Sequence, residues 1–245
     1  MTQKPLSNQP KNLGFFITGS DTEIGKTFVA CAIVRSLCEK YSRVGIYKPV
    51  ASGVVELESS DAYQLWLAAG RPDQPLSRVC PQSFTNPLAP SIAALMEKSS
   101  IDIQVILDGY EYWITNTEFT VVEGAGGLLS PITERLNNAE LAAMLGLPIV
   151  VVVPNRLGCV NQAMMVLEVS RARSLDIFGL VLNQRQVDSN DMSIETNYSL
   201  LRSAMNQNGF AAIPTYAFKY LQSHLVLGDL QNEKYQRDVQ TLKLQ

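Results

Sequence analysis

The chain has almost no histidine and few cysteines. In 245 residues there is one histidine, His224, and the four cysteines form no CxxC pair. A single histidine argues against a Ser/His/Asp triad and against a multi-histidine metal centre. Cysteines without a regular framework fit reduced thiols better than disulfides or a zinc site. Any chemistry must therefore use lysines, carboxylates, hydroxyls and backbone N–H groups.

The chain also lacks an excess of basic charge and a long hydrophobic run. It has 20 basic and 23 acidic residues, a net charge of −3, which gives little support to nucleic-acid binding. The longest apolar run, residues 145–153, is too short to span a bilayer. Residues 1–11 are polar and lack the apolar segment of a signal peptide. We expect a soluble, cytoplasmic protein with no nucleic-acid partner and no membrane contact.

The composition is that of a globular protein with a sizeable core. Hydrophobic residues make up 46% of the chain, so one α/β domain is the economical interpretation and two small domains are the alternative. We expect a flexible N-terminal tail over residues 1–12, a single domain over 13–230, and a polar C-terminal tail or surface helix over 231–245.

The most informative stretch is residues 13–31, LGFFITGSDTEIGKTFVAC. Its apolar start is typical of a buried strand, and from Lys26 apolar residues recur at helical spacing. A strand thus leads into a helix through a turn with Gly19 and Gly25, the setting of a phosphate-binding loop. In such a loop Lys26 would lie along the β- and γ-phosphates and the Thr27 hydroxyl would ligate Mg²⁺. The alternative is a glycine turn before an ordinary helix.

Two further segments place a charged residue at the carboxyl end of a predicted strand, the edge at which open α/β sheets bind ligands. The strand 43–48 ends in Lys48, because Pro49 cannot continue a central ladder. The strand 119–122 delivers Glu123, where nucleotide hydrolases and transferases place a second Mg²⁺ contact. A solvated lysine and a solvated carboxylate are the alternatives.

The remaining apolar patterns alternate between helical and strand character. Asp61, Asn138 and Asn161 read as helix N-caps, and the apolar run 147–153 as a central parallel strand. The alternation indicates a single-domain α/β fold, a mostly parallel sheet flanked by helices with the phosphate-binding loop after its first strand. The predicted helices cover about 62–69, 91–97, 103–114, 139–145, 162–172 and 194–205, and the later strands 147–153, 178–182 and 211–214.

Three motifs, GSDTEIGKT, KPVASG and EGAGG, resemble those of the dethiobiotin synthetases, ATP-dependent enzymes of biotin biosynthesis. Gly19 precedes Gly25 by six residues, one more than usual, and Ser20 takes the usual glycine position; both departures match the family's loop. LGCVN at 157–161 is similar to the family's loop that reaches the substrate carboxylate across a dimer interface. The likeness covers residues 13–215 and implies a deviant phosphate-binding-loop fold and a homodimer with the active site at the interface.

The resemblance implies the reaction. The enzyme would carboxylate 7,8-diaminononanoate with CO2 and close the ureido ring through a carbamoyl phosphate-type mixed anhydride, with release of ADP and phosphate. Lys48 and Lys26 would be catalytic, since with Mg²⁺ they offset the repulsion between a carbamate and a triphosphate. Thr27, Asp61 and Glu123 would hold the Mg²⁺ through oxygen ligands.

The same resemblance implies the binding residues. Asn183 would contact the adenine edge, although Gln184 stands where relatives often carry Asp or Arg, and Ser91 replaces a frequent histidine. The residues implied to bind ATP are Glu23, Ile24, Gly25, Lys26, Thr27, Phe28, Asp61, Glu123, Gly124, Ala125, Gly126, Asn183, Gln184 and Pro214. The residues implied to bind the diamine are Thr22, Ser52, Gly158, Cys159, Val160 and Asn161.

Two other classes of ATP-dependent protein carry a similar loop. A partition- or nitrogenase-type ATPase switch carries a lysine five residues before the loop lysine, where this chain has Asp21. A different carboxylate-activating ATP-dependent ligase, of the cobyrinate amidation type, usually adds a glutaminase domain with a Cys/His pair. The length and the motifs favour the synthetase.

Overall fold

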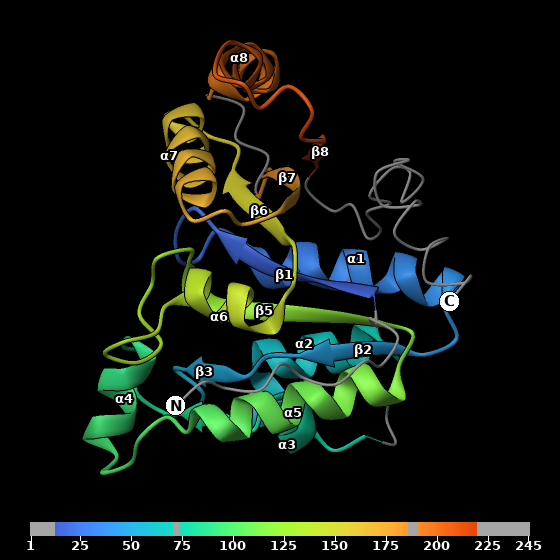
Figure 1. Cartoon of the computed structure of the whole chain (residues 1–245), viewed down its shortest axis with the longest axis vertical. Coiled ribbons are helices and arrows are strands. Elements are labelled where there is room, and N and C mark those ends of the chain that lie inside the picture. Colours follow the sequence, from blue (N-terminus) through green and yellow to red (C-terminus); the bar gives the residue numbers. More distant parts are fainter. Residues whose placement is uncertain (1–12, 71–73, 186–190, 220–245) are drawn as a thin grey trace.

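The structure, a computed structural model, describes residues 13–70, 74–185 and 191–219 (Figure 1). The predicted tails and the end of the predicted domain, 220–230, lie outside these residues. The strands are β1 (Leu13–Gly19), β2 (Val44–Tyr47), β3 (Val50–Ser52), β4 (Gln82–Phe84), β5 (Phe119–Gly127), β6 (Ile149–Pro154), β7 (Ile177–Asn183) and β8 (Thr215–Phe218). The helices are α1 (Lys26–Lys40), α2 (Asp61–Ala68), α3 (Leu76–Val79), α4 (Pro90–Met96), α5 (Ile103–Asn116), α6 (Asn138–Leu145), α7 (Cys159–Ala172) and α8 (Ser193–Gln207), with a 3-10 turn η1 (Leu57–Ser59).

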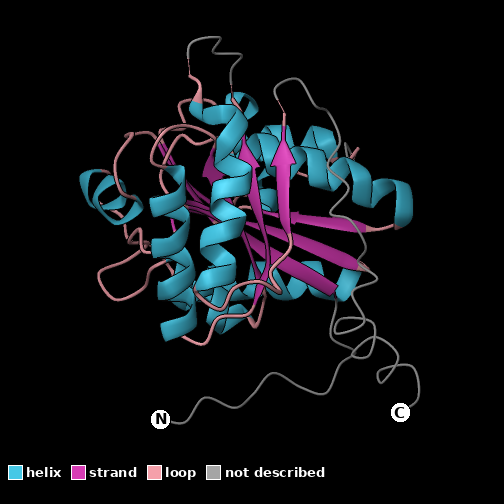
Figure 2. Ribbon diagram, turned by 90° about the horizontal axis from the view of Figure 1, so that it is seen from above, coloured by secondary structure: helices cyan, strands magenta, loops and turns pink. Residues whose placement is uncertain are grey.

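The central sheet has the strand order β2-β5-β1-β6-β7-β8, and each neighbouring pair is parallel. Helices cover both of its faces (Figure 2). Strands buried on both faces need apolar residues throughout, which explains the continuous apolar runs of β1 and β6. The predicted α/β class is confirmed, and β6 has the predicted central position.

A second, two-stranded parallel sheet pairs β3 with β4. The sequence predicts only an extended or looping segment over 79–90, and neither β4 nor α3 is predicted, because elements of three or four residues give no measurable period. This small sheet continues from β2 and places Ser52 beside the carboxyl edge of the main sheet.

Two predicted caps are wrong by one residue. Ser60, not Asp61, caps α2, because its Oγ accepts from the Tyr63 N–H at 3.3 Å. Asn137, not Asn138, caps α6 in a reciprocal capping box with Glu140. Asp61 and Asn138 are therefore the first residues of their helices, and their side chains are available for other contacts.

Two boundaries also differ from the prediction. Helix α7 begins at Cys159, after Gly158 with φ 90°, so Asn161 lies inside the helix and does not cap it. The last strand is β8 and not 211–214. Pro214 has no N–H to donate to the ladder, whereas residues 215–218, TYAF, are mostly strand formers.

The predicted buried side of α5 is confirmed. Ile106, Tyr110 and Trp113 are buried, and Ile103, Leu107 and Ile114 pack against the same core. No helix in the described part of the chain is long and apolar enough to cross a bilayer.

Candidate active site

The turn between β1 and α1 has the backbone of a phosphate-binding loop. Gly25 precedes α1 with φ 82°, and a Cβ there would lie 2.5 Å from Nδ2 of Asn183. Glu23 also has a positive φ, 52°. A glycine is therefore required at position 25, both for its conformation and for the close approach of Asn183.

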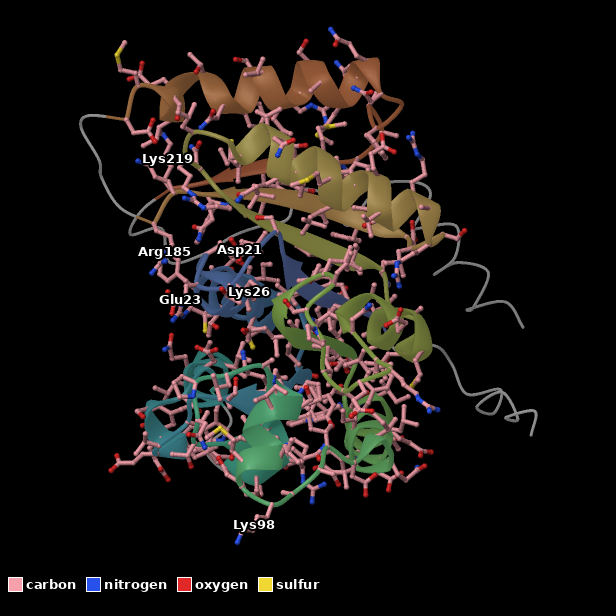
Figure 3. The ribbon with its side chains drawn as sticks, turned by 90° about the vertical axis from the view of Figure 1, so that its left-hand side faces the viewer. Asp21, Glu23, Lys26, Lys98, Arg185 and Lys219 are labelled. Atoms are coloured by element: carbon pink, nitrogen blue, oxygen red, sulfur yellow. The ribbon has the colours of Figure 1, made fainter. Side chains whose placement is uncertain are left out.

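Two side chains at and just beyond the end of β7 hold this turn in place. The Asn183 Nδ2 donates to the Ile24 carbonyl at 2.8 Å, and the Arg185 guanidinium donates to the Glu23 carbonyl. Figure 3 shows Glu23 and Arg185 on the same face of the molecule as Lys26. Sequence analysis missed Arg185, although its position two residues after a strand that ends at the ligand-binding edge is the signal that could have found it.

Lys26 lies at the first turn of α1 and is largely buried. Its Nζ donates to the Asp21 carbonyl at 2.8 Å, so the side chain folds back over the loop. Burial lowers the pKa of Lys26 below its ordinary value, and the nearby carboxylates only partly compensate. The ammonium is thus poorly solvated, which favours the binding of an anion beside it.

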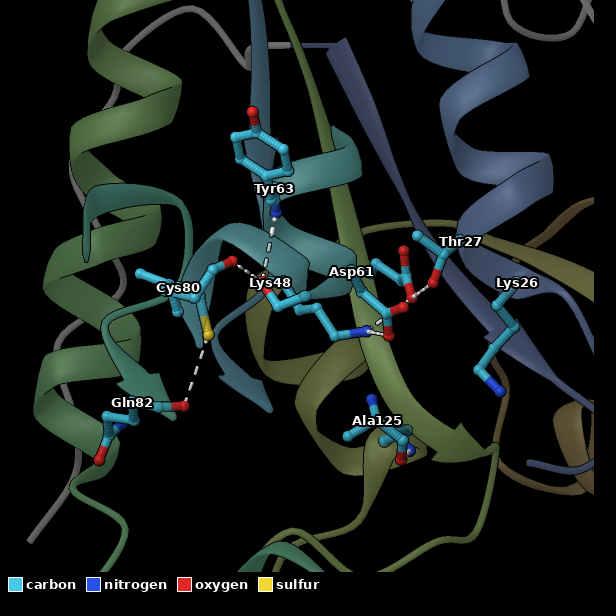
Figure 4. A network of polar contacts seen from close by, with 12 residues as sticks. Lys26, Thr27, Lys48, Asp61, Tyr63, Cys80, Gln82 and Ala125 are labelled. Carbon is cyan, nitrogen blue, oxygen red and sulfur yellow. Dashed lines mark hydrogen bonds and ion pairs between the residues drawn. The ribbon is translucent and has the colours of Figure 1, made fainter. Parts of the chain in front are cut away.

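Lys48 links two acidic residues at the floor of the site (Figure 4). Its Nζ lies 2.7 Å from Glu123 Oε1 and 2.8 Å from Asp61 Oδ2. Burial alone would lower the pKa of Lys48, but Glu123 and Asp61 outweigh that effect and raise it above the ordinary value. Burial likewise would raise the pKa of Asp61, and Lys48 holds it below its usual range. The two carboxylates therefore favour the charged form of Lys48 in this arrangement.

Oxygen atoms suited to a hard divalent ion gather beside Lys48. The Thr27 hydroxyl donates to Glu123 Oε1 at 2.8 Å. The other carboxylate oxygen, Glu123 Oε2, is buried and has no hydrogen-bond partner among the described residues. The described residues contain no cluster of three or more His, Cys, Asp or Glu side chains, so Thr27, Asp61 and Glu123 would fit Mg²⁺ only if water or phosphate completed its shell.

These groups face a cleft of about 1050 Å³, large enough for a nucleotide and a small substrate. Its walls come from the phosphate-binding loop, β3, residues 87–90 and the glycine-rich end of β5. The predicted site residues that line it are Thr22, Glu23, Gly25, Lys26, Thr27, Phe28, Lys48, Ser52, Asp61, Glu123, Ala125 and Gly126.

A smaller cavity of about 320 Å³ lies against the same loop and is lined by Ile24 and Asn183. It shares Thr22, Glu23 and Arg185 with the larger cleft. The Asn183 Oδ1 is buried without a hydrogen-bond partner among the described residues. An amide oxygen in this state can accept from a ligand donor.

Other predicted residues line neither cavity of the single chain. Pro214 precedes the amino end of β8, whereas Phe218 at the other end pairs with Asn183. Cys159 is wholly buried and Asn161 is exposed on α7. The predicted site residues outside both cavities are Gly124, Gln184, Pro214, Gly158, Cys159, Val160 and Asn161.

The parallel sheet, the glycine turn and the two lysines define a nucleotide-binding α/β protein of the phosphate-binding-loop class. A ParA family ATPase from Chlorobium tepidum TLS superposes with a TM-score of 0.48 at 12% identity, over 94% of this chain and 90% of that one. A family model described as an AAA domain matches residues 13–217.

Curated relatives give the family. The ATP-dependent dethiobiotin synthetase BioD of Anaeromyxobacter dehalogenans is 40% identical over 202 residues, 82% of this chain and 89% of the relative. The protein of that name from Rhodopirellula baltica is 37% identical over 204 residues, 77% of this chain and 78% of the relative. The chain belongs to the family of ATP-dependent dethiobiotin synthetases, as the motifs predict, and the relatives support that interpretation over an ATPase switch.

Proposed function

We propose that the chain uses MgATP to convert 7,8-diaminononanoate and CO2 into the cyclic urea dethiobiotin, with release of ADP and phosphate. The observation that carries the proposal is the buried ammonium of Lys48 between Asp61 and Glu123, on the floor of the cleft that Lys26 and Thr27 also line. Family membership at 40% identity supports the same substrates.

Lys48 and Lys26 supply positive charge where two anions must approach. The reaction brings a carbamate against a triphosphate, and fixed ammonium groups in a partly closed cleft lower the energy of that encounter. The pKa of Lys48 is raised by Glu123 and Asp61, which favours its charged form. The role of Lys48 is therefore to stabilise negative charge and to orient the reacting groups. The ureido ring is closed by the second amine of the diamine.

Mg²⁺ would be held by Thr27, Asp61 and Glu123, with the unpartnered Glu123 Oε2 as one ligand. When bound, the ion supplies charge neutralisation to the β- and γ-phosphates. The residues that hold it already contact one another or Lys48.

ATP would lie over the loop, with its phosphates on residues 23–28 and 123–126 and its base beside Asn183 and Gln184. The buried Asn183 Oδ1 is suited to accept from the exocyclic amine of adenine. Gln184 would contribute through its backbone, because its side chain lines neither cavity. Pro214, predicted to bind ATP, is left out of this site, because it precedes the opposite end of β8 and its carbonyl accepts from the Leu180 N–H.

The diamine would occupy the part of the cleft next to Thr22 and Ser52, and its carboxylate would bind residues 158–161 of a partner subunit. In one chain residues 158–161 line neither cavity, which agrees with a site completed across a dimer. Exposed apolar side chains near this loop, Leu157 and Met165, support a contact with a second copy. We place the enzyme in the cytoplasm, where its four free cysteines remain reduced.

The test is ADP release with bicarbonate and the diamine each omitted in turn. The proposal requires that both omissions abolish the rate, and that dethiobiotin form in amounts equal to ADP. ADP release that ignores the diamine would refute the synthetase activity and favour an ATPase switch.

A further inference from the structure

The glycine-rich end of β5 departs from the regular sheet. Ile17 of β1 pairs with Glu123, but the next pair joins Gly19 to Gly127. Three residues, Gly124–Gly126, therefore stand opposite the single residue Thr18, which makes a bulge larger than the usual two residues opposite one. On the other side β2 ends opposite Val122, so the sheet offers the bulge no ladder there.

The amide of Asn138 supplies hydrogen bonds to this bulge. Its Nδ2 donates to the carbonyls of Ala125 and Gly127, each at 2.7 Å, and its Oδ1 accepts from the Ala125 N–H at 3.2 Å. Asn138 is wholly buried, and with these bonds both of its N–H groups and its oxygen are satisfied. The Asn138 side chain, on α6, thus supplies hydrogen bonds that a neighbouring strand would otherwise supply.

The fit around the amide is close. A Cβ at Gly124 would lie 2.5 Å from Asn138 Oδ1 and 2.7 Å from the Phe16 ring. Gly126, in the left-handed region with φ 80°, would bring a Cβ within 2.6 Å of the Ser130 Oγ. These close contacts restrict the backbone conformation of the bulge. Ala125 and Gly126 of the bulge line the cleft.

We infer that Asn138 is a positioning residue of the active site, which fixes the bulge 124–126 so that Glu123 and the glycine backbone meet MgATP in the productive geometry. Asn138 touches neither cavity, so it acts through the bulge. The inference rests on the proposed function, because it takes the cleft as the place of reaction.

The adjacent Asn137 provides a matched control. It lies in the same turn and carries the same amide, but its Oδ1 caps α6 through the N–H groups of Ala139 and Glu140. Asn137→Ala should lower the melting temperature and leave kcat/KM within about twofold, because a cap stabilises the helix without touching the bulge. Asn138→Ala removes a side chain from the same turn but frees the bulge.

The experiment compares Asn138→Ala, Asn138→Ser and Asn137→Ala by thermal melting, by kcat and KM for MgATP and the diamine, and by calorimetric binding of a non-hydrolysable ATP analogue. Misplacement of site groups by about an ångström costs on the order of 100-fold in rate, so Asn138→Ala should lose about 10- to 100-fold in kcat/KM. Asn138→Ser, which keeps one donor and one acceptor, should fall between it and the unsubstituted protein.

A folded Asn138→Ala variant with unchanged kcat/KM and unchanged analogue binding would overturn the inference. So would loss of the folded state in both position-138 variants, since Asn138 would then serve the core. If the unsubstituted protein shows no diamine-dependent ADP release, the proposed function fails, and analogue binding in the variants still reports on the bulge.

Discussion

The Nζ of Lys48 lies 2.7 Å from Oε1 of Glu123, and both side chains are almost completely shielded from solvent. Asp61 completes the group from the first residue of α2, with its side chain 48% exposed. A buried ion pair contributes little net stability but is costly to break on one side, because the remaining charge has no partner. A substitution of Lys48 or Glu123 should therefore change both the activity and the free energy of unfolding.

Replacement of Lys48 by glutamine should abolish turnover while the nucleotide still binds. Loss of one preorganised charge at a reacting oxyanion costs about 10²- to 10³-fold in kcat, and the phosphate-binding loop is untouched. The measurement is ADP release under saturating MgATP, together with analogue binding. Lys40→Gln, at the exposed end of α1, is the control and should behave as the unsubstituted protein. Normal turnover in the Lys48 variant would remove this lysine from the mechanism.

The same variant should lose stability, because Glu123 is then left unpaired. Breaking a buried pair costs about 3–5 kcal/mol, whereas neutralising both partners costs much less. Lys48→Gln combined with Glu123→Gln should therefore regain stability in urea unfolding without regaining activity. If the double variant were no more stable than the single one, the energetic coupling of the pair would be disproved.

Thr27→Val should raise the Mg²⁺ concentration needed for half-maximal rate. Valine keeps the shape of the side chain but removes the hydroxyl that contacts Glu123 at 2.8 Å. A lost bond to a charged group costs roughly 1.5–3 kcal/mol, which corresponds to a shift of about tenfold or more. Thr27→Ser keeps the oxygen and should stay close to the unsubstituted protein. Superimposable metal titrations for Val and Ser would exclude the hydroxyl as a ligand.

Gly25→Ala should remove nucleotide binding, and Gly146→Ala should not. Both glycines have a positive φ, so alanine costs about 1–2 kcal/mol of stability at each. Only at Gly25 does the new Cβ meet a neighbour, the Asn183 amide at 2.5 Å, whereas nothing lies within 4 Å at Gly146. Calorimetry with the ATP analogue, beside urea unfolding of both variants, separates backbone strain from the effect on the loop.

The free energy of unfolding should depend on pH through the carboxyl group of Asp61. The pKa of this carboxyl lies below its ordinary value of 3.8 in the folded state. Its contribution is therefore present above pH 3.8 and is lost as the pH falls through the lower folded value. The difference in unfolding free energy between the unsubstituted protein and Asp61→Asn should shrink between pH 6 and pH 3, as measured by urea unfolding. A difference that stays constant would show that Asp61 is not held by Lys48.

The long elements could be predicted from the sequence because their apolar periods are complete. Strand β6 and helix α5 follow directly from such periods. Lys26, Lys48 and Glu123 could be placed at one edge for a related reason, since each follows a predicted parallel strand, and carboxyl ends of parallel strands meet there.

The contacts that shape the site could not be predicted in the same way. The sequence predicts Asn138 as the helix cap, because adjacent asparagines at a helix start look alike, and only the fold shows that its amide contacts the β5 bulge. Arg185 contacts Glu23 across 162 residues of sequence. Such pairings depend on how distant segments pack. The local pattern can place Arg185 near the ligand-binding edge, but it does not show that Glu23 is its partner.

The two side chains that contact the loop carbonyls have a further effect. In a trans peptide the carbonyl and the following N–H point in opposite directions. Because Arg185 and Asn183 bind the carbonyls of Glu23 and Ile24, the N–H groups of Ile24 and Gly25 point away from these two side chains. The conformational entropy of aligning these donors is thus lost during folding and not during association, so more of the interaction energy would remain for the proposed binding of a triphosphate.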